Sequence, residues 1–114
     1  MAIEWPSVPP TPAEVARIIQ QQARNDAFRI TPHGQQEMVE EAITLDPLLQ
    51  ALRSCQILED YPEHLRGACC LVLGYTEAGR PLHVVCTTSL PTLVIITVYE
   101  PQPPRWVTPT QRGR

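Results

Sequence analysis

The 114-residue chain contains no lysine, and all nine of its basic residues are arginine. Acidic residues outnumber basic ones by twelve to nine, so the formal net charge is -3. Domains that bind nucleic acid mainly through charge carry a strongly basic surface. That class is excluded here, and any contact with phosphate has to come from a small cluster of arginines, whose planar guanidinium groups suit phosphate.

The chain also lacks a long hydrophobic run. Its longest, residues 93–99, is far shorter than the roughly 20 residues that a helix needs to cross a bilayer. The first ten residues have neither the basic start nor the apolar core of a signal peptide. These absences predict a cytoplasmic protein with no membrane-bound state, in which the four cysteines are thiols and not a disulfide framework.

Motifs for metals and phosphates are missing as well. No Cys-x-x-Cys pair, glycine-rich phosphate loop or nucleophile elbow is present. Cys69 and Cys70 are adjacent, and His83 and Cys86 are three residues apart, so on strands each pair points to opposite faces. We predict no metal site and no cofactor, although the residue types that could supply ligands are present: Cys55, Cys69, Cys70, Cys86, His33, His64 and His83.

Charged residues make up 18% of the chain and hydrophobic residues 43%, which is typical of an ordered globular domain. One domain is expected at this length. The 13 prolines gather at both ends and at the boundaries of predicted elements. We therefore expect an extended arm over residues 1–10, a single domain over residues 11–110 and a tail over residues 111–114.

Two threonine–proline pairs predict helix starts. Thr11-Pro12 and Thr31-Pro32 each place a capping hydroxyl before a proline at the first helical position. A third start is predicted after Thr44, where leucines recur at helical spacing. The expected helices cover residues 12–24, residues 32–41 and a segment from residue 45.

From residue 56 on, the apolar pattern changes to a period of two, which indicates β-strands. The expected strands cover residues 56–61, 68–75, 82–88 and 93–99, and residues 28–30 fit either a short strand or an extended lead-in. Short turns between consecutive strands predict antiparallel pairing. The expected fold is α+β, with the N-terminal helices packed on one face of a four-stranded antiparallel sheet.

Several short motifs, in the right order, resemble a known bacterial family. They are TPHGQQEM at residues 31–38 with AIT at 42–44, ILEDYP at 57–62, PLHVV at 81–85, ITVYEP at 96–101, and Trp106. Over about residues 28–110 the chain resembles the family of domain of unknown function 4258, which is grouped with the RelE/ParE-like toxins of toxin–antitoxin pairs.

The resemblance implies a RelE-like fold of helices packed on an antiparallel sheet. Toxins with this fold typically cut messenger RNA, often on the ribosome, and use no metal. Their sites combine basic, tyrosine or histidine side chains on the sheet face and near the C-terminus. The implied partner is an antitoxin protein that covers the sheet face, such as a small zinc-ribbon protein.

A ribonuclease that acts through the 2′-hydroxyl of RNA needs a base, a group that stabilises charge on the phosphorane, and an acid for the leaving oxygen. The candidates for these roles are His33, His83, Tyr99 and Arg105. Trp106 and Arg112 are the candidates for stacking on a base and contacting the RNA backbone. Structural roles are the alternative: His83 is a core histidine if its strand face packs on helices, and the arginines belong to a solvated tail.

Two observations favour a protein without catalytic activity. Relatives tend to show an arginine just before the methionine of the first motif, where this chain has Glu37, and Glu40 and Glu41 follow. Together with the negative net charge, these acids favour a catalytically inactive protein-interaction module of the same fold. A homodimer is a further alternative, because residues 93–98 would make a sticky apolar edge if they formed an uncovered last strand.

Overall fold

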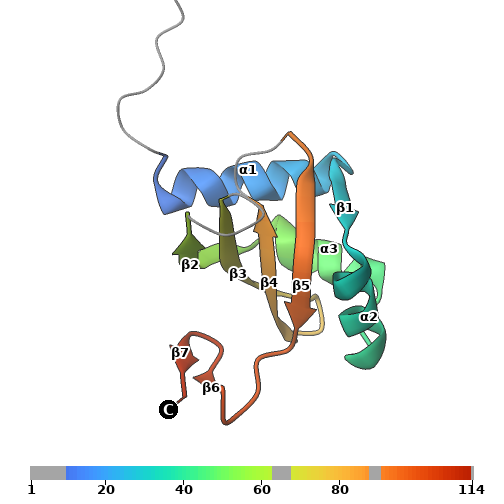
Figure 1. The fold of residues 1–114 in the computed structure, drawn as a ribbon, viewed down its shortest axis with the longest axis vertical. Helices are drawn as coiled ribbons and strands as arrows, with labels where there is room; N and C mark the ends of the chain where they lie inside the picture. The colour runs from blue at the N-terminus through green and yellow to red at the C-terminus, as the bar shows by residue number, and fades with distance from the viewer. Residues whose placement is uncertain (1–9, 63–67, 88–90, 114) are drawn as a thin grey trace, which may run out of the picture.

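The computed structural model describes residues 10–62, 68–87 and 91–113, so most of the arm expected over residues 1–10 lies outside the described residues. In Figure 1 the helices α1 and α3 pass behind the strands of one sheet, which confirms the predicted α+β class. The elements are α1 (Pro12–Arg24), β1 (Phe28–Ile30), α2 (Pro32–Glu40), α3 (Leu45–Arg53), β2 (Gln56–Tyr61), β3 (Cys69–Tyr75), β4 (Pro81–Thr87), β5 (Leu93–Tyr99), β6 (Trp106–Thr108) and β7 (Gln111–Arg112).

The prediction of a four-stranded antiparallel sheet is wrong. The sheet has five strands in the order β1-β5-β4-β3-β2, and β1 pairs with β5 in parallel, from Phe28 opposite Leu93 to Ile30 opposite Ile95. The other three pairings are antiparallel, as expected. A three-residue strand is too short to show a period of two, so the sequence could not separate a fifth strand from an extended lead-in.

Threonine hydroxyls cap the first two helices, as the sequence predicted. The hydroxyl of Thr11 accepts a hydrogen bond from the N–H of Glu14, and that of Thr31 accepts one from the N–H of Gly34. Thr31 is buried, and its own N–H and hydroxyl donate to carbonyl oxygens of β5 at 2.9 and 3.1 Å. The start of α2 is therefore fixed directly on β5.

The main core lies between the helices and one face of the sheet. Alternate strand residues, among them Val72, Val84 and Val98, pack there against leucines of α3. Gly74 of β3 lies so close to α3 that a Cβ atom on it would be 2.0 Å from the carbonyl oxygen of Ala51. The sequence needs glycine at this position because the strand and the helix backbone approach each other directly.

Glutamates of α2 complete the outer edge of β5. The N–H of Val98 donates to Oε1 of Glu37 at 3.0 Å, and the N–H of Glu100 donates to Oε1 of Glu41 at 3.1 Å. β1 pairs with the first half of the same edge. β5 is therefore an inner strand whose edge is occupied, and the homodimer stays a prediction.

Replacing Glu37 by alanine is expected to lower the free energy of unfolding by about 1–2 kcal/mol, because the part-buried N–H of Val98 loses its acceptor. Glu40 is an exposed residue of the same helix, so Glu40→Ala is the matched control and should change stability by less than about 0.5 kcal/mol. Urea unfolding measures both values. Equal effects of the two substitutions would show that the edge contact contributes nothing.

Arg80, in the turn between β3 and β4, ties the end of α2 to the end of β5. Its Nε atom lies 2.6 Å from Oε1 of Glu100. Its other nitrogens donate to the carbonyl oxygens of Glu41 and Ala42 at 2.7 and 3.1 Å. These carbonyls belong to the C-terminal end of α2, where no helical N–H is available to them. The chain therefore leaves β5 from a fixed point.

Strands β6 and β7 form a separate C-terminal hairpin at the end of the sheet where β5 ends and β4 begins (Figure 1). Gln111–Arg112, in the segment predicted as a tail, form β7. The N–H of Gly113 closes the hairpin by donating to the carbonyl oxygen of Arg105 at 2.7 Å. Only glycine fits there, since a Cβ atom would lie 1.7 Å from the carbonyl oxygen of Pro104.

Candidate functional site

His83 points to the sheet face opposite α1 and α3. Its neighbour Val84 lies in the core beneath the helices, so the alternation of a strand places His83 on the other side. Tyr99 is its directly opposite partner on β5. The ring of His83 is nevertheless completely buried, because the C-terminal hairpin lies over it. The site is thus formed by two sheet strands and a covering hairpin.

The polar atoms around His83 form one continuous hydrogen-bonded chain. Nε2 of His83 lies 2.7 Å from the carbonyl oxygen of Pro109, which can only accept, so Nε2 carries the proton. Nδ1 is then the acceptor for the phenol of Tyr99 at 3.1 Å. The oxygen of Tyr99 accepts in turn from the indole N–H of Trp106 at 3.2 Å. The Pro109 carbonyl therefore determines which atom donates and which accepts in each hydrogen bond of this series.

The three rings of this chain also pack edge to face. The ring centres of His83 and Trp106 are 4.4 Å apart at an interplanar angle of 87°, and those of His83 and Tyr99 are 5.2 Å apart at 68°. Such arrangements are favourable between aromatic rings. We call the set of His83, Tyr99, Trp106 and the Pro109 carbonyl the His83 chain.

Burial controls the protonation of the two titratable groups in the His83 chain. Loss of water lowers the pKa of His83, an effect that the Pro109 carbonyl and the charge of Glu59 only partly oppose. Burial likewise raises the pKa of Tyr99, against the hydrogen bond from Trp106. The imidazole is therefore held neutral and the phenol keeps its proton, as the hydrogen-bond directions require.

An ion pair between β2 and β7 holds the second strand of the hairpin against the sheet. Nε and Nη2 of Arg112 each lie 2.6 Å from an oxygen of the Glu59 carboxylate. The guanidinium carbon lies 4.7 Å from the centre of the Trp106 ring, within the range of a cation–π contact. The phenol of Tyr61 donates a further hydrogen bond to Glu59. Arg112 thus contacts both the sheet and the Trp106 ring.

This ion pair shifts the acid–base properties of its members. The hydrogen bonds from Arg112 lower the pKa of Glu59 to about 2, although partial burial acts in the opposite direction. Partial burial and the bond to the Glu59 carboxylate raise the pKa of Tyr61 to about 12. Glu59 is consequently a fixed anion and Tyr61 a fixed hydrogen-bond donor at neutral pH.

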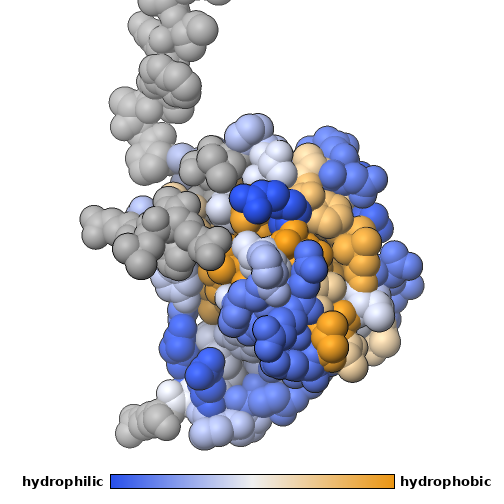
Figure 2. All heavy atoms as spheres, turned by 45° about the vertical axis from the view of Figure 1, so that its right-hand side comes forward, coloured by the Kyte–Doolittle hydropathy of each residue, from blue (hydrophilic) through white to orange (hydrophobic). Residues whose placement is uncertain are grey.

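An open cleft of about 250 Å³ lies beside the His83 chain, between the end of α2 and the hairpin. Tyr99 and Trp106 form part of its wall, so the outer end of the chain is reachable from solvent. Figure 2 shows a face of the molecule whose lower half is mostly hydrophilic, with one hydrophobic patch toward its right. The cleft is acidic, with three carboxylates and one arginine among its lining residues, Glu37, Glu41, Tyr99, Glu100, Gln102, Arg105 and Trp106.

The structure brings four of the six candidate residues into contact: His83, Tyr99, Trp106 and Arg112. Arg105 is exposed and lines the adjacent cleft. His33 lies apart on α2, where its side chain is 64% exposed and its Nε2 atom is 3.3 Å from Oε1 of Glu37. His33 is connected to the cleft through Glu37, which is one of the residues that line the cleft.

Sequence reasoning missed Glu59 and Tyr61 as members of the site. The segment ILEDYP carries the family resemblance, and Glu59 and Tyr61 are two residues apart on its strand, hence on one face. The two-residue spacing of Glu59 and Tyr61 is the sequence feature that could have identified them. The pairing of Glu59 with Arg112 has a separation of 53 residues, and no local pattern indicates it.

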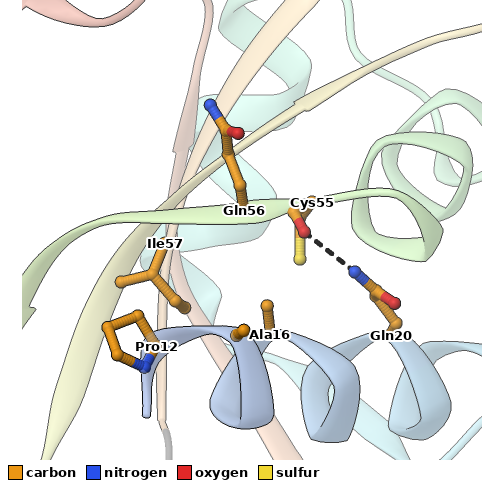
Figure 3. A pocket seen from close by; sticks show the side chains of 7 residues that line it. Pro12, Ala16, Gln20, Cys55, Gln56 and Ile57 are labelled. Carbon is orange, nitrogen blue, oxygen red and sulfur yellow. Dashed lines mark hydrogen bonds between the residues drawn. The ribbon is translucent and has the colours of Figure 1, made fainter.

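A second cleft, of about 360 Å³, lies between α1 and the start of β2 and is lined by small apolar residues such as Pro12, Ala16 and Ile57 (Figure 3). Gln20 bonds across it to the carbonyl oxygen of Cys55 at 2.9 Å. Burial raises the pKa of the Cys55 thiol to about 12, so it is unreactive. This cleft offers no acid, base or nucleophile, which leaves the His83 chain as the candidate site.

Within the described residues, no group of three or more His, Cys, Asp or Glu side chains is placed to hold a metal ion. All four cysteines lie within the described residues, are buried and are not joined in disulfides. Across the same described ranges, no helix is long and apolar enough to cross a membrane.

A family described as "Domain of unknown function (DUF4258)" matches residues 30–100, more than half of the chain. The chain belongs to this family. The DUF4258 match contains His83, Tyr99, Glu59 and Tyr61, whereas Trp106 and Arg112 of the hairpin lie outside it. No curated protein and no solved structure matches the chain.

The buried His83 predicts a pH dependence of folding. Its pKa in the folded protein lies below the ordinary value near 6.5, so the unfolded state binds the proton more readily. The contribution of the neutral His83 to the free energy of unfolding is therefore complete above pH 6.5. It is lost as the pH falls from 6.5 through the pKa of His83 in the folded protein. Urea unfolding at pH 7.5, 6.5 and 5.5 should show a decline that His83→Gln lacks. Equal pH profiles would contradict a depressed pKa.

Proposed function

We propose that this DUF4258 protein is a RelE-like toxin-family member of a toxin–antitoxin pair, and that it cleaves messenger RNA without a metal at the His83 chain. The observation that supports this most is the meeting of His83, Tyr99 and Trp106. Each comes from a segment that carries the family resemblance, and together they form one hydrogen-bonded chain. The antiparallel strands and the helices on one sheet face agree with the fold that the resemblance implies.

The residues of the site match the roles that 2′-hydroxyl cleavage needs. A neutral imidazole such as that of His83 is a suitable base for the 2′-hydroxyl. The phenol of Tyr99, which keeps its proton, can donate it to the leaving 5′-oxygen. The guanidinium of Arg112 can stabilise the negative charge of the phosphorane. The products would be a 2′,3′-cyclic phosphate and a 5′-hydroxyl, so the atoms balance without a metal-bound water.

The test is RNA cleavage by the purified full chain in EDTA, with and without ribosomes. General acid–base catalysis is typically worth about 10²–10⁴-fold, so His83→Ala should lower the rate by that range and Tyr99→Phe should lower it as well. Glu77→Gln, on the exposed turn between β3 and β4, is the control and should leave the rate unchanged. Absence of cleavage in both settings, by the unaltered chain and also by Glu59→Gln, which loses the charge that pairs with Arg112, would refute the proposal, as would full activity of His83→Ala.

The acidic cleft favours a second candidate, a catalytically inactive module that binds a protein partner of the antitoxin type. Glu37, Glu41 and Glu100 line that cleft, where Arg105 is the basic lining residue and Arg80 pairs with Glu100 from outside the lining; the remaining acidic charge disfavours RNA phosphates and suits a basic protein segment. Tight binding of the neighbouring gene's product, weakened by salt and by Glu100→Gln, without any RNA cleavage, would establish this candidate instead.

A further inference from the structure

The hairpin that covers His83 is attached to the sheet by a few polar contacts and one aromatic ring. Its strands hydrogen-bond to each other and form no ladder with the five-stranded sheet. Among the described residues, hydrogen bonds join it to the sheet between Pro109 and His83, between Trp106 and Tyr99 and between Arg112 and Glu59, and the Trp106 ring packs on that of His83. Over residues 106–113 the only buried side chain is that of Trp106.

The covered groups and the cover come from different parts of the chain. His83, Tyr99, Glu59 and Tyr61 lie within residues 30–100, which match the family, and the whole hairpin lies after them. The hairpin contributes nothing to the main core, which is built from the helices and the five strands. Its release therefore need not disturb the sheet, because surface ion pairs contribute little to stability and such segments open locally.

We infer that the C-terminal hairpin is an autoinhibitory strap, which closes the sheet-face site so that RNA reaches His83 only when the strap is displaced. This inference rests on the proposed function. Displacement removes the Pro109 carbonyl from Nε2 of His83 and the indole N–H of Trp106 from the oxygen of Tyr99. It also releases the guanidinium of Arg112 from Glu59, so that Arg112 can contact a phosphate of RNA that lies between the displaced strap and the sheet. The strap thus holds three reactive groups in mutual contact while no substrate is bound.

Two substitutions should open the strap without altering a residue of the His83 chain. Glu59→Gln removes the charge that holds Arg112. Gly113→Ala places a Cβ atom 1.7 Å from the Pro104 carbonyl oxygen and so prevents the hairpin from closing on itself. The two act by different physical means: the first weakens the attachment of β7 to β2, and the second disturbs the closure of the hairpin on itself. Glu77→Gln makes the same chemical change as Glu59→Gln on an exposed turn and is the matched control.

Opening is measured without RNA by the rate at which diethyl pyrocarbonate modifies each histidine, read by mass spectrometry of peptides. His33 is exposed and serves as the internal reference in every sample. In the unaltered chain, His83 should react at least about tenfold more slowly than His33, because its ring is covered. Glu59→Gln and Gly113→Ala should raise its relative rate about fivefold or more, and Glu77→Gln should not.

RNA cleavage in EDTA by the same four proteins separates the outcomes. Faster modification of His83 together with faster cleavage in both strap variants supports the inference. Unchanged modification of His83 in both variants overturns it, whatever the RNA result. Equal cleavage by the unaltered chain and the opened variants also overturns it, while leaving the proposed function intact. Faster modification with no cleavage in any protein refutes the proposed function and, with it, the autoinhibitory role.

Discussion

Replacing Gly74 by alanine is expected to lower the free energy of unfolding by about 3 kcal/mol, at the upper end of the usual cost of overpacking. The added Cβ atom would lie 2.0 Å from the carbonyl oxygen of Ala51 and 2.8 Å from its Cα atom. These are backbone atoms of α3, so the clash is not relieved by turning a side chain. Either the helix or β3 has to move, which disturbs the main core.

Gly79→Ala is the matched control for this prediction. Gly79 has φ +82 in the turn between β3 and β4, and no atom lies within 4 Å of the position of an added Cβ. Its substitution costs only the backbone strain of a left-handed conformation, about 1–2 kcal/mol. Urea unfolding of both variants should therefore rank Gly74→Ala as the more harmful. The reverse ranking would show that β3 and α3 are not in direct backbone contact.

Replacing Trp106 by alanine is expected to cost about 3 kcal/mol and to release the hairpin from the sheet. The indole is 2% exposed, donates to Tyr99, packs against His83 and lies beneath the guanidinium of Arg112. Its removal leaves the cover of His83 without its only buried side chain. In the variant the pKa of His83 should rise toward its ordinary value, because water reaches the ring.

Trp106→Phe separates the ring contacts from the hydrogen bond. Phenylalanine keeps a ring against His83 and beneath Arg112 but has no N–H for Tyr99, so the cost should be about 1 kcal/mol and His83 should stay covered. Urea unfolding and histidine NMR report the two quantities. If the alanine variant kept a depressed His83 pKa, the indole would not be what seals the site.

The sequence predicted the helices and the four long strands because their signals are local. A threonine followed by proline caps a helix by its own backbone geometry, and α1 and α2 begin where those pairs predict. The period-two pattern similarly located β2 and β5 at their observed bounds. The strand β1 was uncertain because its pairing with β5 depends on a partner more than 60 residues away.

The setting of His83 illustrates what sequence patterns leave open. The alternatives were an open sheet face, with the ring free for substrate, or a helix-packed face, with the ring in the core. The ring is on the face away from the helices and is still buried, because a hairpin from residues 106–112 covers it. Apart from Trp106, Val107 and Pro109 those residues are polar, and they show no strand period, so their packing depends on the contacts of Trp106 with Tyr99 and of Arg112 with Glu59.

The glutamates of α2 are a second case in which the sequence pattern did not reveal the contacts of a side chain. Glu37 and Glu41 were interpreted as a change in binding chemistry, since relatives tend to have basic groups nearby. Both carboxylates accept hydrogen bonds from backbone N–H groups at the end of β5. Part of their role is therefore to complete the sheet edge, and only the cleft that they share with Glu100 and Arg105 bears on a partner.

The most direct test of this account is ¹⁵N NMR of the His83 imidazole in the full chain. The hydrogen bonds of His83 require a neutral ring with the proton on Nε2, facing the Pro109 carbonyl, and an unprotonated Nδ1 that accepts from Tyr99. The burial of the ring also predicts that it resists protonation as the pH falls below 6.5. A proton on Nδ1, or titration at the ordinary pKa, would show that the hairpin does not seal His83 and would contradict the account.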